Sequence, residues 1–126
     1  MVVVDISVVI DHTRQKSKIS IFDRFSKQTK DRLGISLITI QELFAGQSTK
    51  DKETEDRLLG LIDSLEILPY TFEVAKLAGE VERDLDQPID LADAAIAATA
   101  IVNEAQLLTL NIKDFAKIKG LKLASV

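Results

Sequence analysis

The chain has 126 residues, of which 46% are hydrophobic and 29% charged, as expected for one globular domain with its own core. It contains no cysteine, which excludes disulfides, thiolate zinc sites and cysteine nucleophiles. We expect a single domain over residues 1–126, in the cytoplasm, with neither a signal peptide nor a membrane span.

The charges are unevenly distributed. The net charge of −4 argues against nucleic-acid binding by overall charge alone. Residues 14–32 nevertheless carry seven basic and two acidic side chains, and residues 111–126 carry four lysines and one aspartate. The acids are concentrated between residues 33 and 110. Solvated helix faces explain such blocks as well as an anionic ligand does.

Val2–Val4 is predicted to be a strand buried on both faces, in the middle of a parallel sheet. The strand ends at Asp5, and a helix is expected from about Ser7 to His12. Because the flanking sequence is apolar, an ionised Asp5 is costly to bury unless a cation or a hydrogen-bond donor meets it.

The rest of the chain alternates between helices and strands. Helices are expected over 19–31, 39–45, 50–64, 71–86, 90–105 and 111–118, and strands over 35–38, 66–68, 106–110 and 121–123. This alternation predicts an α/β fold with a largely parallel sheet of four to five strands. Tyr70 and the five phenylalanines are expected in the core.

Three further acids each follow a helix-capping residue by three positions: Glu42 after Thr39, Asp93 after Asp90, and Asp114 after Asn111. Each pair alone is an ordinary helix start. In a parallel sheet, however, these helix starts would lie along one edge, together with Asp5. Four neighbouring carboxylates repel one another unless a cation is bound. Oxygen ligands without histidine or cysteine favour Mg²⁺ or Mn²⁺.

Other catalytic patterns are missing. The five glycines are scattered and form no phosphate-binding loop. The only histidine, His12, ends a helical stretch and is expected to be at the surface or structural.

Four segments, in order, resemble the motifs of PIN-domain proteins, and more closely those of VapC-type toxins of toxin–antitoxin pairs. They are residues 2–11 (VVVDISVVID), 38–46 (ITIQELFAG), 91–100 (LADAAIAATA) and 108–115 (LTLNIKDF). The resemblance covers essentially the whole chain. It implies a three-layer α/β/α domain and a metal-dependent endoribonuclease, usually a homodimer, which a cognate antitoxin holds inactive.

The same resemblance implies roles for individual residues. Asp5, Glu42 and Asp93 match the three core acids that hold Mg²⁺ or Mn²⁺, and Asp114 matches a fourth, more variable acid. Ser7 matches a hydroxyl that positions Asp5 or the attacking water, and Asn111 matches a polar site residue. The chain departs from the family at Ile6, where a threonine is usual, so that Ser7 is expected to act alone. The charge distribution, rather than the resemblance, indicates which residues contact the RNA backbone. The candidates lie in the basic segment from Arg14 to Arg32, namely Arg14, Lys16, Lys18 and Arg24, followed by Lys113 and Lys117.

Two alternatives belong to other classes. A phosphoacceptor receiver domain has similar length and Mg²⁺-binding acids, but it needs an aspartate after the third strand, where this chain has Leu68-Pro69-Tyr70. A catalytically idle PIN-fold module that binds only a protein partner would keep the fold. Titration with metal and a generic RNA separates that module from a nuclease, because only the nuclease would cleave.

Overall fold

The computed structural model describes residues 1–125 and contains the predicted alternation of strands and helices. In chain order the elements are β1 (Val2–Val4), α1 (Ile6–Arg14), α2 (Ile21–Gln28), β2 (Leu33–Ser36), α3 (Leu37–Ala45), the 3₁₀ helix η1 (Gln47–Lys50), α4 (Lys52–Asp63), β3 (Glu66–Leu68), α5 (Phe72–Asp84), α6 (Leu91–Val102), β4 (Gln106–Leu108), α7 (Ile112–Ala116) and β5 (Lys122–Leu123). None of these helices is long and apolar enough to cross a membrane.

The five strands form one sheet in the order β3-β2-β1-β4-β5, and every neighbouring pair is parallel. The predicted parallel sheet, with β1 at its centre, is therefore confirmed. Receiver domains have the order 2-1-3-4-5, so the receiver alternative is wrong. The strand order changes direction between β1 and β4, and in open α/β sheets ligands bind beyond the strand ends at such a point.

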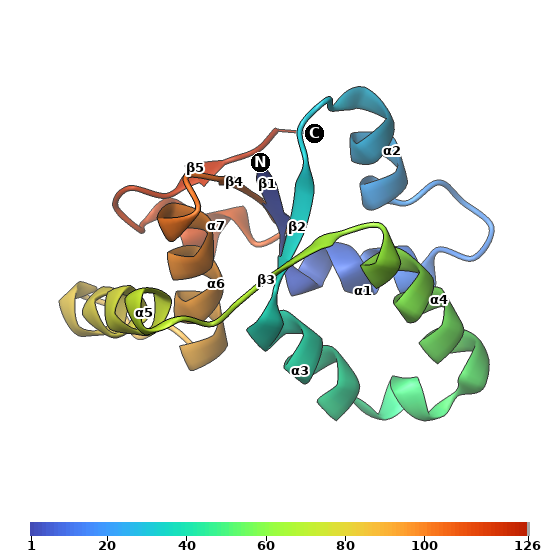
Figure 1. The fold of residues 1–126 in the computed structure, drawn as a ribbon, viewed down its shortest axis with the longest axis horizontal. Helices are drawn as coiled ribbons and strands as arrows, with labels where there is room; N and C mark the ends of the chain where they lie inside the picture. The colour runs from blue at the N-terminus through green and yellow to red at the C-terminus, as the bar shows by residue number, and fades with distance from the viewer. Residues whose placement is uncertain (126) are drawn as a thin grey trace.

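The helices cover both faces of the sheet and make three layers. Figure 1 shows α1, α2 and α4 on one side of the sheet and α5, α6 and α7 on the other. Val2 and Val4 pack into a core cluster with Phe22 and Leu58, whereas Val3 packs into a second cluster with Ile96 and other residues of the opposite face. All three valines are fully buried, as the run of β-branched residues predicts.

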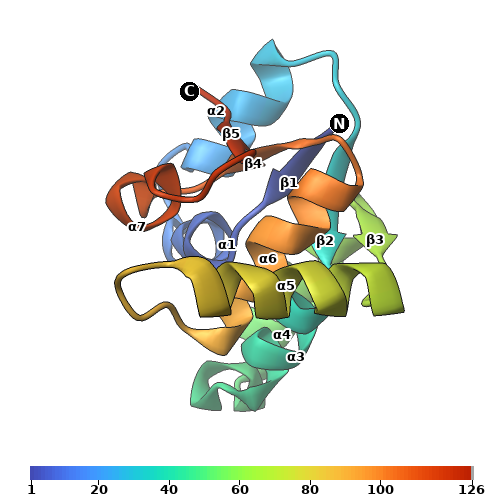
Figure 2. The ribbon, with the colours of Figure 1, turned by 90° about the vertical axis from the view of Figure 1, so that its left-hand side faces the viewer.

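Helix α6 lies between the sheet and α5, which crosses in front of it in Figure 2. Its buried face is built largely from alanines, which permit close approach on both sides. The helix ends at Val102, earlier than predicted, because a Schellman turn follows. The backbone N–H of Glu104 donates to the Ile101 carbonyl at 3.0 Å, and that of Ala105 donates to the Ala100 carbonyl at 2.8 Å.

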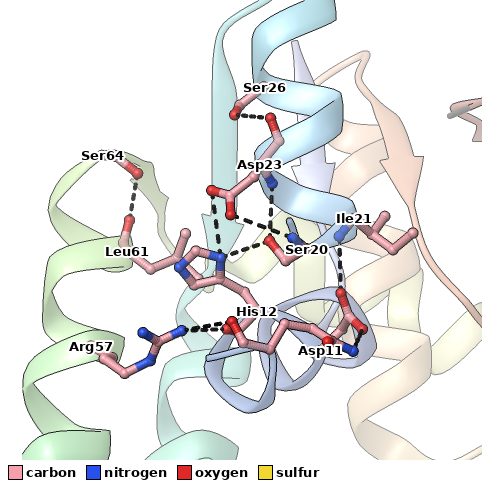
Figure 3. A network of polar contacts seen from close by, with 10 residues as sticks. Asp11, His12, Ser20, Ile21, Asp23, Ser26, Arg57, Leu61 and Ser64 are labelled. Carbon is pink, nitrogen blue, oxygen red and sulfur yellow. Dashed lines mark hydrogen bonds and ion pairs between the residues drawn. The ribbon is translucent and has the colours of Figure 1, made fainter. Parts of the chain in front are cut away.

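A polar network joins α1, α2 and α4 (Figure 3). His12 Nδ1 lies 2.8 Å from Ser20 Oγ, which accepts the backbone N–H of Asp23 and so caps α2. Arg57 on α4 donates to the His12 carbonyl at 2.9 Å, satisfying the end of α1. The His12 ring also packs edge-on against Phe22. This environment is a structural one, as we expected for His12.

Three of the six aromatic side chains lie outside the core. Phe22, Phe25 and Phe115 are buried as predicted. The prediction is wrong for Phe44, Tyr70 and Phe72, whose exposed fractions are 39%, 41% and 84%. Phe72 is the first residue of α5 and Phe44 lies in the last turn of α3, and at these positions the rest of residues 1–125 covers each ring only in part.

Candidate active site

Asp5 lies at the carboxyl end of β1 and is completely buried. It is the N-cap residue of α1, but its side chain does not cap the helix. Its Oδ2 instead accepts hydrogen bonds from Ser7 Oγ and Thr109 Oγ1, both at 2.7 Å. Its Oδ1 is buried without a hydrogen-bond partner in the described chain. One oxygen of this carboxylate is therefore fixed, and the other is left available for a ligand.

The turn between β4 and α7 holds the two hydroxyls in place. The backbone N–H of Leu110 donates to Ser7 Oγ at 3.0 Å, and that of Asn111 donates to Thr109 Oγ1 at 2.9 Å. Asn111 thus contributes its backbone, and its side chain forms no capping bond to α7. Thr109 was missing from the sequence prediction. The available signal was a hydroxyl at the end of a buried strand.

Glu42 lies in the second turn of α3. The predicted pairing of Thr39 as cap with Glu42 is wrong, because α3 begins at Leu37 and Ser36 caps it by accepting the backbone N–H of Ile38. Glu42 Oε1 is a second buried carboxylate oxygen without a partner. Burial raises the pKa of Glu42, and the charges of Asp5 and Asp90 raise it further.

Asp93 is the third residue of α6, in its first turn, as predicted. Its carboxylate forms no ion pair within residues 1–125. Burial raises the pKa of Asp93 to about 6, with further contributions from the charges of four other acids. In decreasing order of effect these are Asp5, Asp90, Glu42 and Asp114. The four predicted acids therefore lie within electrostatic reach of one another.

Asp114 and Asp90 lie at the exposed rim of this cluster. Asp114 is in the first turn of α7, as predicted. Asp90, predicted only as a helix cap, makes no side-chain capping bond. Its charge instead raises the pKa of both Glu42 and Asp93. Asp90 is thus a fifth acid near the site, whereas the spacing in the sequence indicated only that it caps α6.

The cluster fits a divalent cation by its donor chemistry. Within residues 1–125 no three acidic side chains already form a closed metal site, so a cation would need water ligands or small side-chain movements. Asp5 Oδ1 and Glu42 Oε1 are both buried and unpartnered, which costs free energy unless a ligand meets them. Mg²⁺ binds through few carboxylates and keeps several waters, as this arrangement requires.

The basic candidates for gripping RNA are dispersed. Arg14 ends α1, and Lys16 and Lys18 follow it in the connection to α2. Arg24 lies on α2, at the end of the sheet where the strands begin, whereas the acids lie where the strands end (Figures 1 and 2). Lys113 is exposed on α7 beside Asp114, and Lys117 follows the same helix.

Comparisons with known proteins agree with this geometry. Residues 2–121 match the PIN domain. The chain is 35% identical to ribonuclease VapC10 of Mycobacterium tuberculosis (strain H37Rv), over 97% of this chain and 91% of that protein. It is 30% identical to ribonuclease VapC1 of Rickettsia felis, over 98% of this chain and 95% of that protein.

Solved structures give the same grouping. The fold matches a chain of VapBC2 from Rickettsia felis, bound to a promoter DNA fragment, with a TM-score of 0.85, 27% identity and 98% coverage of both chains. A chain of DNA-bound VapBC from Salmonella typhimurium matches with a TM-score of 0.81 and 29% identity, over 98% of this chain and 96% of that one. The chain therefore belongs to the PIN-domain family, in the group that contains the VapC ribonucleases.

Proposed function

We propose that this protein is the toxin of a type II toxin–antitoxin pair, an endoribonuclease that depends on Mg²⁺ or Mn²⁺. The observation that carries the proposal is the junction of Asp5, Glu42 and Asp93. Two buried carboxylate oxygens lack partners there, and the pKa of Asp93 is raised to about 6 by burial and neighbouring acids. The VapC relatives, named as ribonucleases, supply the reaction class.

Asp5, Glu42 and Asp93 would hold the cation, and Asp114 would complete the site from its rim. The cation, when bound, supplies an activated water and offsets negative charge on the cleaved phosphate. Ser7 and Thr109 keep Asp5 Oδ2 hydrogen-bonded, so that Oδ1 faces the site. A bound cation would favour the ionised form of Asp93, because its positive charge would offset the repulsion from the neighbouring acids.

Substitution of the acids tests this proposal. We expect Asp5→Asn and Asp93→Asn to abolish RNA cleavage in Mg²⁺, and excess EDTA to abolish cleavage by the unmodified protein. Asp63→Asn is the matched control, because Asp63 is an exposed acid in the last turn of α4. Cleavage that persists in Asp93→Asn, or in EDTA, would overturn the assignment. Sequencing RNA ends after induction in cells would identify the target.

The expected protein partner is an antitoxin. The solved relatives from Rickettsia felis and Salmonella typhimurium are VapBC complexes, and we infer that this chain also binds a VapB-like protein in the cytoplasm. Co-expression with the product of a small neighbouring gene should yield a stable complex that no longer cleaves RNA. An idle binding module would form the complex but would show no metal-dependent cleavage when released from it.

A further inference from the structure

A groove of about 320 Å³ lies between α1, α3, η1 and α4, and we call it the α1–α4 groove. Its polar lining consists of two cationic and four hydroxyl side chains: Arg14, Lys16, Thr13, Ser48, Thr49 and Thr54. Apolar side chains of α1, α3 and α4 complete the lining. Figure 1 shows α1, α3 and α4, which supply most of this lining.

The groove has the charge of an anion-binding surface. None of its lining residues is acidic, although the chain as a whole has a net charge of −4. By contrast, a groove beside α5 is lined by three acids, Glu80, Asp84 and Asp86, together with Lys117 and Lys119. The lining of the α1–α4 groove is therefore cationic, and the nearest acids stand at its edge, where Asp51 Oδ2 accepts the Thr54 hydroxyl at 2.8 Å and Glu53 lies beside Lys16.

Its two cations are available to a ligand. Arg14 forms no salt bridge within the described chain. Lys16 Nζ lies 3.9 Å from Glu53 Oε1, but the two side chains are 62% and 71% exposed. A pair so exposed contributes little free energy and is easily exchanged for another anion.

Residues that line the groove lie on the same helices as, or on helices that directly follow, two of the acids. Helix α1 begins just after Asp5 and ends at Arg14, a distance of about 13 Å at the rise of an α-helix. On α3, Leu43 lines the groove and directly follows Glu42. Both helices start at the end of the sheet where the acids lie (Figure 1). A chain-like anion held at the acids therefore has a nearby cationic surface to follow.

We propose that the α1–α4 groove binds the ribose–phosphate backbone of the RNA on one side of the cleaved bond, an inference that rests on the proposed ribonuclease function. Arg14 and Lys16 meet phosphates, which gives affinity without base specificity. Thr13, Thr49 and Thr54 already donate their hydroxyl protons to the Ile10 carbonyl, the Gly46 carbonyl and Asp51 Oδ2, so their oxygens can accept from a ribose 2′-hydroxyl. The Ser48 hydroxyl can donate to a phosphate oxygen. The net negative charge of the whole chain makes such a local cationic surface necessary for binding a polyanion.

The test removes the two cations and measures salt-dependent RNA binding. Arg14→Gln/Lys16→Gln is compared with Lys27→Gln/Lys30→Gln, which removes equal charge from exposed residues on and just after α2. Fluorescence anisotropy of a short labelled single-stranded RNA is followed over a salt series in EDTA. Two lost phosphate contacts should reduce the slope of log K against log salt by about 1.4, and the control should leave the slope unchanged.

Equal slopes for the two double variants would overturn the proposal, as would failure of the unmodified protein to bind this RNA. Intact RNA binding with loss of antitoxin binding would show that the groove is a protein interface instead. Because the assay contains EDTA, it does not depend on cleavage. Groove-dependent binding without cleavage in Mg²⁺ would refute the proposed function alone, and cleavage with unaltered slopes would refute the groove alone.

Discussion

Asp5 is held by two hydroxyls, one from its own neighbourhood in the sequence and one from the far end of the chain. Ser7 is two residues away and Thr109 is 104 residues away, and both donate to the same oxygen. The expectation that Ser7 acts alone because Ile6 lacks a hydroxyl is therefore wrong. Ile6 packs against the core cluster under α1 and α2, and Thr109 provides the second hydrogen bond.

Replacing Thr109 tests whether this second hydroxyl matters for the cation. Thr109→Val keeps the shape of the side chain but removes its hydrogen bond to Asp5. We expect the affinity for Mg²⁺, or the activity, to fall by about 10- to 100-fold, as is usual when a hydrogen-bond partner of a metal ligand is lost. The measurement is a Mg²⁺ titration of RNA cleavage. Thr109→Ser should restore the midpoint, and a valine variant that titrates like the unmodified protein would contradict the role.

Asp93 makes stability depend on pH. Its pKa is about 6 in the folded protein against an ordinary value of 3.8, so the folded state binds the proton more tightly. The resulting penalty is fully present above about pH 6 and disappears as the pH falls towards 4. Asp93→Asn should therefore raise Tm above pH 6, and this gain should shrink between pH 6 and 4.

Calorimetry in EDTA across this range measures the difference between variant and unmodified protein. Glu42 also has a raised pKa, so part of the pH dependence remains in the variant. Asp63→Asn, at the exposed end of α4, should change Tm only slightly, and this change should not vary between pH 6 and 4 in the way expected for Asp93→Asn. A gain for Asp93→Asn that is the same at pH 4 and pH 7 would contradict the assigned cause.

Local signals in the sequence located most elements but not all of their ends. Thr71 caps α5 as predicted, because its hydroxyl accepts the backbone N–H of Val74. At α3 two hydroxyl residues compete, and Ser36 caps the helix because the backbone turns into it directly from β2. Likewise, the apolar pattern of α6 continues past its end at Val102, so periodicity alone extended it too far.

The end of α6 carries a residue suited to replacement. Glu104 has a φ of 53°, a left-handed conformation that favours glycine. Glu104→Gly should stabilise the protein by about 1 kcal/mol, because it removes a steric cost at this turn. Gly79→Ala in α5 is the companion, since an added methyl there meets nothing within 4 Å. It should stabilise by about 0.5–1 kcal/mol.

Urea unfolding measures both changes in stability. One variant introduces a glycine and the other removes one, yet both are expected to stabilise the protein. A stability loss in Glu104→Gly, as expected for glycine inside a helix, would show that the turn does not impose its conformation.

At the scale of the whole molecule, the exposed aromatics indicate a further interface. Phe72 is 84% exposed at the start of α5, and Phe44 is exposed on α3. Exposed apolar side chains that gather into a patch mark a surface that another protein covers. The homodimer expected from the family would provide such a surface, and we predict that it includes Phe72.

Phe72→Glu should shift the protein towards the mass of a monomer in sedimentation experiments, because a charge would be buried in the interface. Ile19→Glu is the matched control. Ile19 is 62% exposed, but it lies in the connection before α2, a helix on the opposite side of the sheet from α5 (Figure 1). Dissociation by Ile19→Glu, with no effect of Phe72→Glu, would place the interface elsewhere.

The sequence predicted that the four acids lie near one another because parallel strands bring the helix starts that follow them to one edge of the sheet. The spacing from a capping residue was not itself distinctive, and the cap assigned to Glu42 was wrong. It predicted the parallel sheet from alternation, and the burial of β1 from three valines. It did not predict the strand order, since the pairing of β1 with both β2 and β4 depends on packing between distant segments. For the same reason it missed Thr109 and the site role of Asp90, whose residue types are common in turns.

The pairing of β1 with β4 also orders events during synthesis. Val2–Val4 is the middle of the sheet, but its partner Gln106–Leu108 is made about a hundred residues later. Asp5 likewise meets Thr109 only after that strand has been translated. Contacts so far apart in sequence form late, because the intervening chain must close first. A growing chain that has not reached β4 thus lacks both the partner strand of β1 and the Thr109 hydroxyl that holds Asp5.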